Sequence, residues 1–185
     1  MEKISIQENF LAEEEFVALR DTITSVKFPW YFSPIVTSDN EKEPTSPGLW
    51  IHIVHESNVP FSPFYDSHFP PILEQLNPEF PPRYTGSAVV CLARIKLNLN
   101  HRLPEPYFSD FHSDIFLEDH VAAQWTTSIL YINTNNGYTE FEDGTKVDSV
   151  ANRLVSFPAN TRHRVVTQTD EQTRIVINFN YLKMI

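Results

Sequence analysis

The chain has 185 residues, of which 41% are hydrophobic and 21% are charged, a composition typical of a globular protein and not of a disordered one. Its net charge of −10 lacks the basic excess that a broad nucleic-acid-binding face needs, so we expect no nucleic-acid partner. A single cysteine excludes an internal disulfide, and no run approaches the roughly 18 apolar residues of a membrane span, so we also expect no membrane partner.

The amino-terminal segment predicts a location and a first helix. Residues 1–16 lack the apolar core of a signal peptide, so we expect a soluble, cytoplasmic protein. Residues 10–26 repeat apolar side chains at roughly helical spacing, and acidic residues crowd the first turns, where the helix dipole favours them. This pattern indicates one amphipathic helix that packs on the remainder of the chain.

Residues 28–85 are rich in proline and aromatic side chains. The heptapeptide LWIHIVH, residues 49–55, alternates well enough to predict a strand, and PPILEQLN, residues 70–77, predicts a short helix with proline in its first turn. The remainder reads as long irregular loops, which often cover a functional cleft. Residues 33–48 form the candidate lid.

From residue 86 onward the pattern changes to short strands separated by turn residues. No helix is predicted between them, which favours a sandwich or jelly roll over βαβ units. We therefore expect one domain of residues 1–185, in which helix and loops at residues 1–85 support a mainly β, cupin-like double-stranded β-helix (jelly roll) at residues 86–185. The expected strands are residues 87–99, 126–133, 153–158, 163–168 and 173–182, with a hairpin at residues 139–147 that turns at Asp143-Gly144.

The stretch FHSD, residues 111–114, places a histidine and an aspartate two positions apart. Residues i and i+2 of a strand share one face, so His112 and Asp114 could bind a single ion. A neutral imidazole nitrogen and a hard carboxylate oxygen together suit ferrous iron. Alone this signal is weak, because any such pair in a loop looks the same, and a third ligand must come from elsewhere in the chain.

Among the other histidines, His163 stands out as the third ligand through its context. It follows an apolar strand that ends at Phe157-Pro158 and a turn, and it opens the next strand. By itself, a histidine at such a position more often caps a turn. The remaining histidines read as surface or hydrogen-bonded residues: His52, His55, His68, His101 and His120.

Eleven residues after His163 comes Arg174, inside the strand-like run TRIVINFNYL. Alternation places Arg174, Val176 and Asn178 on one face and the apolar Ile175, Ile177 and Phe179 on the other. A buried arginine needs a partner carboxylate, which a bound diacid would supply in a bidentate pair. The alternative is an edge strand whose arginine meets a surface aspartate or glutamate.

Taken in order, the H-x-D pair, SILYIN, GYTEF, NRLVSFP, His163 and Arg174 resemble the iron(II)/2-oxoglutarate-dependent oxygenases, in particular their prolyl-hydroxylase-like branch. The resemblance covers roughly residues 86–182. It implies a dioxygenase that couples oxidative decarboxylation of 2-oxoglutarate to succinate with C–H oxidation, as a hydroxylase of a peptidyl residue such as proline or of a small molecule. Iron(II), 2-oxoglutarate and O₂ would be needed, with ascorbate in support.

The resemblance also implies roles for individual residues. It matches His112, Asp114 and His163 to the iron triad, and Arg174 to the basic residue that pairs with the distal carboxylate of 2-oxoglutarate. An aspartate at position 114, and not glycine or alanine, retains the full triad as hydroxylases do.

Four more residues enter through the resemblance as neighbours of the cosubstrate. Tyr131 matches a tyrosine that hydrogen-bonds the same carboxylate, although it reads equally as a core aromatic. Asn98 lies near another cosubstrate contact, with Arg94 as the weaker alternative. Thr139 matches a small residue near the pocket and reads more readily as structural.

Two other kinds of function stay open. One is a non-catalytic jelly-roll module that binds a ligand or partner protein, suggested by the aromatic loops and by the 13 acidic against 5 basic residues in residues 1–85. The other is a cupin-like metalloenzyme that does not use 2-oxoglutarate. The sequence leaves the substrate and the oligomeric state open.

Overall fold

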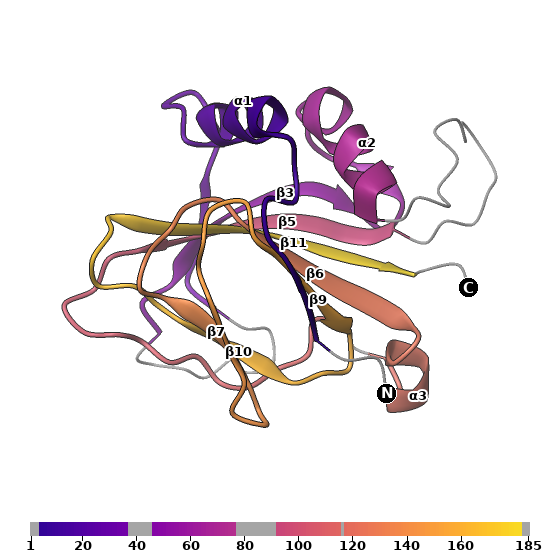
Figure 1. Cartoon of the computed structure of the whole chain (residues 1–185), viewed down its shortest axis with the longest axis vertical. Coiled ribbons are helices and arrows are strands. Elements are labelled where there is room, and N and C mark those ends of the chain that lie inside the picture. Colours follow the sequence, from indigo (N-terminus) through magenta and orange to yellow (C-terminus); the bar gives the residue numbers. More distant parts are fainter. Residues whose placement is uncertain (1–3, 37–45, 77–91, 116, 183–185) are drawn as a thin grey trace.

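The computed structural model of the chain describes residues 4–36, 46–76, 92–115 and 117–182 (Figure 1). Its largest unit is an antiparallel sheet made of β1 (Ser5–Gln7), β2 (Tyr31–Ser33), β3 (Leu49–Glu56), β4 (Val59–Pro60), β5 (Leu92–His101), β6 (Trp125–Tyr131), β9 (Leu154–Pro158) and β11 (Thr173–Leu182). The strands lie in the order β1-β9-β6-β11-β5-β3-β2, and β4 pairs with β3.

A smaller antiparallel sheet lies below the large one in Figure 1. Its order is β10-β7-β8, built from β7 (Tyr138–Phe141), β8 (Lys146–Asp148) and β10 (His163–Val166). The chain passes back and forth between the two facing sheets from β6 to β11, which is the arrangement of a jelly roll. The expected mainly β, jelly-roll fold is therefore confirmed.

Two helices, α1 (Glu13–Ile23) and α2 (Tyr65–Leu76), cover the other face of the large sheet (Figure 1). The amphipathic helix expected within residues 10–26 is confirmed by α1, which carries three glutamates in its first turn and buries Phe16, Leu19 and Ile23. In the part of the chain that the structure describes, no helix is long and apolar enough to cross a membrane.

The second helix corrects one expectation. It begins at Tyr65, so Pro70 and Pro71 lie inside the helix and not in its first turn. Neither proline can donate the backbone hydrogen bond of its position. The helix nevertheless forms because it buries an apolar stripe against the sheet, consisting of Phe69, Ile72, Leu73 and Leu76.

The remaining strand predictions are confirmed by β3, β6, β9, β10 and β11. The strand expected at residues 87–99 is confirmed from Leu92 onward, and residues 87–91 lie outside the described residues. The predicted hairpin is formed by β7 and β8, with Gly144 in the left-handed conformation at φ 88°. The expectation of no helix between the strands is wrong at one place, because α3 (Asp119–Ala122) forms a single turn between β5 and β6.

Residues 1–85 supply three strands, β1, β2 and β4, beyond the strand that was expected at residues 49–55. Strands β1 to β4 all join the large sheet, so this half of the chain extends it on both sides. Of the candidate lid at residues 33–48, residues 37–45 lie outside the described part of the chain. The organisation as a single domain stays a prediction.

Two apolar clusters lie on opposite faces of the large sheet. The larger one joins the sheet to α1 and α2 and includes Phe69, Ile95, Leu97, Ile177 and Phe179. The smaller one fills the space between the sheets at one end, with Ile129, Tyr131, Phe141, Val147, Val155, Phe157 and Val176. Alternation along β11 explains the division, as its sequence predicted.

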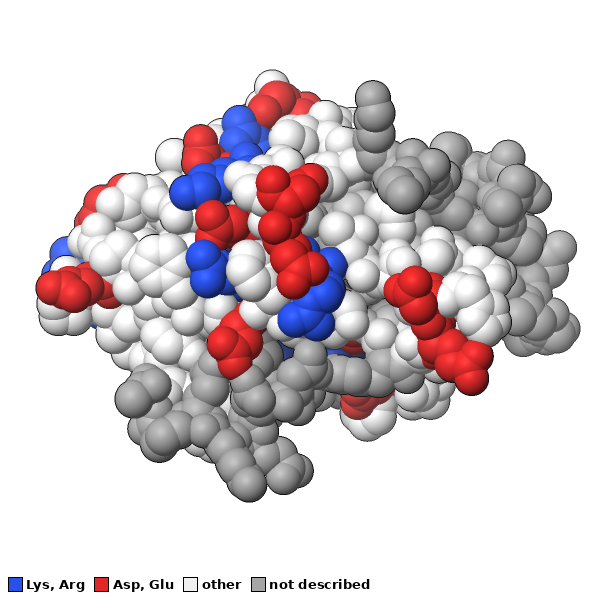
Figure 2. All heavy atoms as spheres, turned by 90° about the horizontal axis from the view of Figure 1, so that it is seen from below, with Lys and Arg blue, Asp and Glu red and all other residues white. Residues whose placement is uncertain are grey.

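Seen from below, the molecule presents acidic and basic side chains that are interspersed (Figure 2). On the small sheet, Glu140 of β7 pairs with Arg164 at 2.6 Å and with Lys146 at 3.5 Å. Arg162 pairs with Glu142 at 3.2 Å. These basic side chains are therefore largely balanced by neighbouring carboxylates.

Candidate metal centre and adjoining cavities

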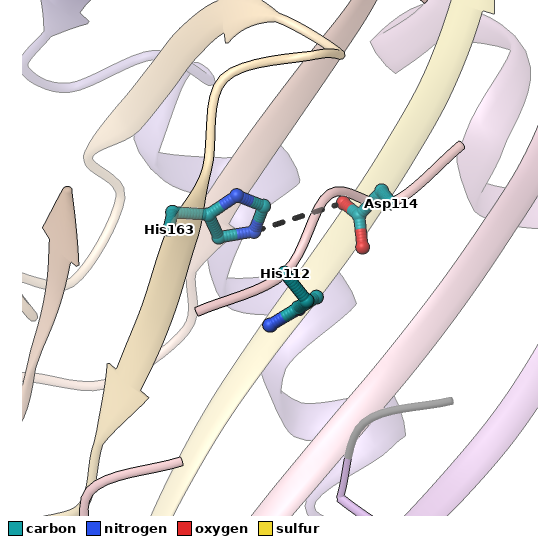
Figure 3. A group of neighbouring side chains, drawn as sticks. All are labelled: His112, Asp114 and His163. Atoms are coloured by element: carbon teal, nitrogen blue, oxygen red, sulfur yellow. Dashed lines mark ion pairs between the residues drawn. The ribbon is translucent and has the colours of Figure 1, made fainter. Parts of the chain in front are cut away.

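His112, Asp114 and His163 come together between the two sheets (Figure 3). Each offers one ligand atom, and these atoms all lie within 4.8 Å of one another. His163 is the first residue of β10, and it forms an antiparallel bridge with His112 through two backbone hydrogen bonds of 2.9 Å. The bridge brings together two histidines that are far apart in the sequence.

The expectation that His112 and Asp114 share a strand is wrong. Only His112 makes a strand-like bridge, and the backbone bends at Asp114. The bend turns the carboxylate toward the large sheet, where Asn180 of β11 donates to Oδ2 at 3.3 Å and Arg94 of β5 donates to Oδ1 at 3.4 Å. The three side chains still converge, but through a turn and not through strand alternation.

Asp114 is held as an anion. Its side chain is 6% exposed, and burial alone would raise its pKa. The neighbouring His163, Arg94 and His112 and the hydrogen bond from Asn180 outweigh burial and lower the pKa of Asp114 to about 2. The carboxylate is therefore ready to bind a cation at neutral pH.

The rings of both histidines are oriented by the same kind of backbone contact. Nδ1 of His112 lies 3.2 Å from the carbonyl oxygen of Asp110, and Nδ1 of His163 lies 3.1 Å from that of Thr161. A proton on Nδ1 donates to this carbonyl and leaves the Nε2 lone pair free for a metal ion. Nε2 of His163 lies 4.0 Å from Oδ2 of Asp114.

His163 is neutral at pH 7. The residue is 3% exposed, and its ring packs edge-on against Phe157 with 4.8 Å between ring centroids. Burial lowers the pKa of His163 to about 4, against the opposing effect of Asp114. Metal ligands must be deprotonated, so the donor set of two imidazoles and one carboxylate fits a divalent metal such as iron(II).

A cavity adjoins the two histidines on one side. Its wall on the large sheet comes from β5, β6 and β11, and its opposite wall comes from β7 and β10. The lining residues are Val36, Leu49, Asn98, Asn100, His112, Ile129, Thr139, His163, Arg164, Val165, Arg174, Val176 and Asn178.

Arg174 is buried in this cavity wall at 2% exposure. Its Nε donates to Oγ of Ser149 at 2.8 Å, and one terminal nitrogen donates to Oγ1 of Thr139 at 3.3 Å. Among the described residues, no carboxylate lies within 4.0 Å of its guanidinium, and burial lowers its pKa. A buried cation without an anion is costly, so this wall fits a ligand carboxylate.

Three asparagines in the same wall carry buried atoms without partners. Oδ1 of Asn98, Nδ2 of Asn100 and Oδ1 of Asn178 have no hydrogen-bond partner in the part of the chain that the structure describes. Buried polar atoms are nearly always bonded, so these atoms indicate a polar ligand or water at the site. Together with Arg174 they form a cradle that suits a small dicarboxylate.

The other residues expected near a cosubstrate take different places. Asn98 lines the cavity, whereas Arg94 lies beside Asp114 and does not. Tyr131 is fully buried behind Thr139, to which its hydroxyl donates at 2.7 Å, and its ring lies 5.5 Å from the guanidinium of Arg174. Thr139 itself lines the cavity, although the sequence favoured a structural role.

Sequence reasoning missed two residues that position Arg174. Ser149 accepts its Nε hydrogen bond, and Gly137 leaves room for its side chain. A Cβ at Gly137 would lie 2.9 Å from Cδ of Arg174, closer than real contacts allow. It also missed Asn100, and it placed Asn178 on the face of Arg174 without assigning it to the site; in both cases the signal was a polar residue at an inward-facing strand position.

Comparison with known proteins identifies solved structures that share this fold. No protein-family model matches the chain, and no curated protein matches it either. Several solved structures, however, do match the chain. An oxidoreductase of the 2OG-Fe(II) oxygenase family from Burkholderia pseudomallei aligns over 98% of this chain and 85% of its own, with a TM-score of 0.61 and 10% identity.

Two prolyl hydroxylases align as well. The viral collagen prolyl hydroxylase of Paramecium Bursaria Chlorella virus-1, solved with 2-oxoglutarate, shares 13% identity and a TM-score of 0.58 over 99% of this chain and 97% of its own. The prolyl hydroxylase of Trichoplax adhaerens, solved with a peptide of hypoxia inducible factor, shares 15% identity and a TM-score of 0.53 over 97% and 83%. This chain therefore has the fold of the 2-oxoglutarate- and iron(II)-dependent oxygenases, prolyl hydroxylases among them.

Proposed function

We propose that this protein is an iron(II)- and 2-oxoglutarate-dependent dioxygenase, a hydroxylase that couples decarboxylation of 2-oxoglutarate to succinate with oxidation of a C–H bond. The observation that carries the proposal is one cavity that joins His112 and His163 to Arg174, a buried arginine without a carboxylate partner among the described residues. The likeness to solved oxygenases supports the same reading.

His112, Asp114 and His163 would hold the metal, because two imidazoles and a carboxylate together suit a divalent ion such as iron(II). When bound, iron(II) supplies the chemistry that uses O₂ to convert 2-oxoglutarate to succinate and CO₂ and to oxidise the substrate. The protein contributes the position of each reactant and the exclusion of water.

Arg174 would bind the distal carboxylate of 2-oxoglutarate, since its fork of donors matches a carboxylate. Ser149 and Thr139 orient that fork by accepting two of its hydrogen bonds. Asn98 would reach the cosubstrate from β5, with its amide oriented by the ligand, and Tyr131 would support the arginine from behind through Thr139. Ile129 and Val176 give the same cavity an apolar side that excludes water.

The substrate is a peptidyl residue such as proline or a small molecule. The peptide complex of the Trichoplax adhaerens enzyme supports the first. Ascorbate as a supporting reductant and a cytoplasmic location complete the proposal.

The test is the conversion of 2-oxoglutarate to succinate by the purified protein with iron(II), O₂ and ascorbate, together with calorimetric binding of manganese(II). Asp114→Ala and His112→Ala should abolish turnover and weaken metal binding, because each removes a ligand. His120→Ala is the matched control, since that side chain is 74% exposed on α3 and lies outside the centre. It should leave both measurements unchanged.

Arg174→Ala separates the proposal from its alternatives. It should raise the KM for 2-oxoglutarate roughly a hundredfold, because a buried charged pair is lost. Metal-dependent turnover that needs no 2-oxoglutarate and is unchanged in Arg174→Ala would point to a cupin-like metalloenzyme. No metal binding and no turnover would leave a non-catalytic jelly-roll module and overturn the proposal.

A further inference from the structure

A second cavity lies beside the metal centre, toward the other end of β5. It offers about 220 Å³ of space, which suits a small molecule or a single side chain. Val36 and His112 line both cavities, so the two meet at the metal centre. The residues that line it are Ser33, Ile35, Val36, Arg94, Lys96, His112, Ser113 and Asp114.

Strand alternation explains why the two cavities differ. Arg94, Lys96, Asn98 and Asn100 occupy every second position of β5 and so share the face that looks toward the metal centre. The two asparagines line the cavity of Arg174, and the two cations line the second one. Along this one strand, the ligand-facing surface changes from neutral amides to positive charge.

The positive charge of the second cavity is only partly balanced. Arg94 is paired with Asp114 at 3.4 Å, and its Nε also donates to Oδ1 of Asn180 at 3.2 Å. The ammonium group of Lys96 makes no hydrogen bond or ion pair with any described residue, whereas Arg94 beside it does. Burial lowers the pKa of Lys96, Arg94 acts in the same direction, and Asp114 and Glu56 oppose them from a distance. One cation of this pocket therefore has no anion of its own.

We propose that Lys96, with Arg94 beside it, binds an oxyanion of the substrate, so that the proposed oxygenase acts on a small acid at a carbon near its carboxylate or phosphate group. This inference rests on the proposed function. A point charge on a flexible stem suits either oxyanion. Ile35 and Val36 line the same pocket and would contact the aliphatic part of the acid.

The cosubstrate does not account for this charge. Arg174 anchors the far end of the first cavity, and Lys96 lies on the opposite side of Asn98 along β5. An internal proline of a peptide has no charge to offer Lys96. The surplus cation therefore favours a free acid over an internal, uncharged peptide residue as the substrate.

The test measures binding of short acids by saturation-transfer NMR, with zinc(II) in place of iron(II) and saturating 2-oxoglutarate. The probes are butanoate, its neutral analogue butanamide, and propyl phosphate. Wild-type protein should bind at least one of the two anions about tenfold more tightly than the amide, as expected for one charged pair. The two anions distinguish a carboxylate site from a phosphate site.

Lys96→Met should remove this preference, whereas Lys96→Arg should retain it. Lys27→Met is the matched control, because Lys27 is exposed and lines neither cavity, and it should leave the preference unchanged. Lys96→Met should also raise the melting temperature of the ligand-free protein, since it replaces a partly buried cation that has no paired anion by an apolar side chain of similar length.

Failure of this inference differs from failure of the proposed function. Equal binding of anions and amide by the wild type, or an unchanged preference in Lys96→Met, would overturn the inference while metal and 2-oxoglutarate still bind. A lower melting temperature of Lys96→Met would also overturn it, by revealing a structural partner for the lysine. Loss of 2-oxoglutarate and metal binding by the wild type would instead overturn the proposed function.

Discussion

The two faces of the large sheet are built from the same strands, but they differ in chemistry. Toward α1 and α2, β11 presents Ile177 and Phe179, which are fully buried in the larger apolar cluster. Toward the small sheet, the same strand presents Arg174, Asn178 and Asn180. One strand thus serves both the core and the candidate site, because its side chains alternate.

The comparison shows that buried polar atoms without partners, which lower stability, are concentrated on one face of the sheet. Five buried side-chain atoms lack a hydrogen-bond partner in the described part of the chain, and three of them are asparagine atoms in the Arg174 cavity. Each unsatisfied group costs about 1–3 kcal/mol. The helix-covered face supplies stability through close apolar packing, whereas the face with the cavities carries polar atoms that have no partner among the described residues.

The largest effect should come from alanine substitutions of two adjacent β11 residues whose side chains point to opposite faces of the sheet. Phe179→Ala should lower the free energy of unfolding by about 3–5 kcal/mol, because it leaves a cavity beside Phe69. Asn178→Ala should change it by less than about 1 kcal/mol and should weaken 2-oxoglutarate binding instead. Urea unfolding and calorimetry measure the two quantities. Equal destabilisation by both variants would contradict the division between the faces.

A smaller effect is expected from alanine substitutions of two glycines, one beside Arg174 and one in the turn between β7 and β8. Gly137→Ala should raise the KM for 2-oxoglutarate roughly tenfold, since the new Cβ meets Arg174 and must displace it. Gly144→Ala has free space around its Cβ but a φ of 88°, so it should cost about 1 kcal/mol of stability and leave the KM unchanged. Steady-state kinetics and thermal unfolding of both variants check this crossed pattern, and a KM effect at Gly144 would break it.

The smallest expected effect is a decrease in the free energy of unfolding at acidic pH. His52 and His55 lie under the helix-covered face, and burial lowers the pKa of each below its ordinary value. The unfolded chain therefore binds more protons as the pH falls below about 6.5, so the free energy of unfolding should fall from pH 7 to pH 5. His163 acts in the same direction from the other face.

His55→Phe should reduce this loss, because it removes the titrating ring and retains an aromatic side chain against Tyr65. His120→Gln, which changes an exposed ring, should keep the wild-type dependence. Urea unfolding of the metal-free protein at several pH values measures the difference. Identical pH profiles for wild type and His55→Phe would show that His55 does not contribute.

Much of the architecture follows from local patterns. Alternation in TRIVINFNYL predicts both faces of β11, and Asp143-Gly144 predicts the turn between β7 and β8. The helix α2 is where local rules failed, because Pro70 and Pro71 suggested its start. Burial of its apolar stripe outweighs the two missing hydrogen bonds, and that burial depends on the sheet beneath.

For parts of the site, the sequence predicted which residues take part but not how they are arranged in space. The sequence marked His112, Asp114, His163 and Arg174, and the structure brings them around one centre and its cavity. It did not predict that Arg94 would face Asp114. That pairing depends on where residues 112–114 cross the large sheet.

The sequence by itself determined the jelly-roll strands, their two faces and the residue types of a metal site, because hydrophobic alternation and short motifs are local properties of the chain. Only the tertiary structure decided that Gly137 and Ser149 position Arg174 and that Lys96 lines a second cavity. These contacts join strands that are distant in the sequence. Their partners are set by the register between strands and by the packing of the sheets, which no single segment encodes.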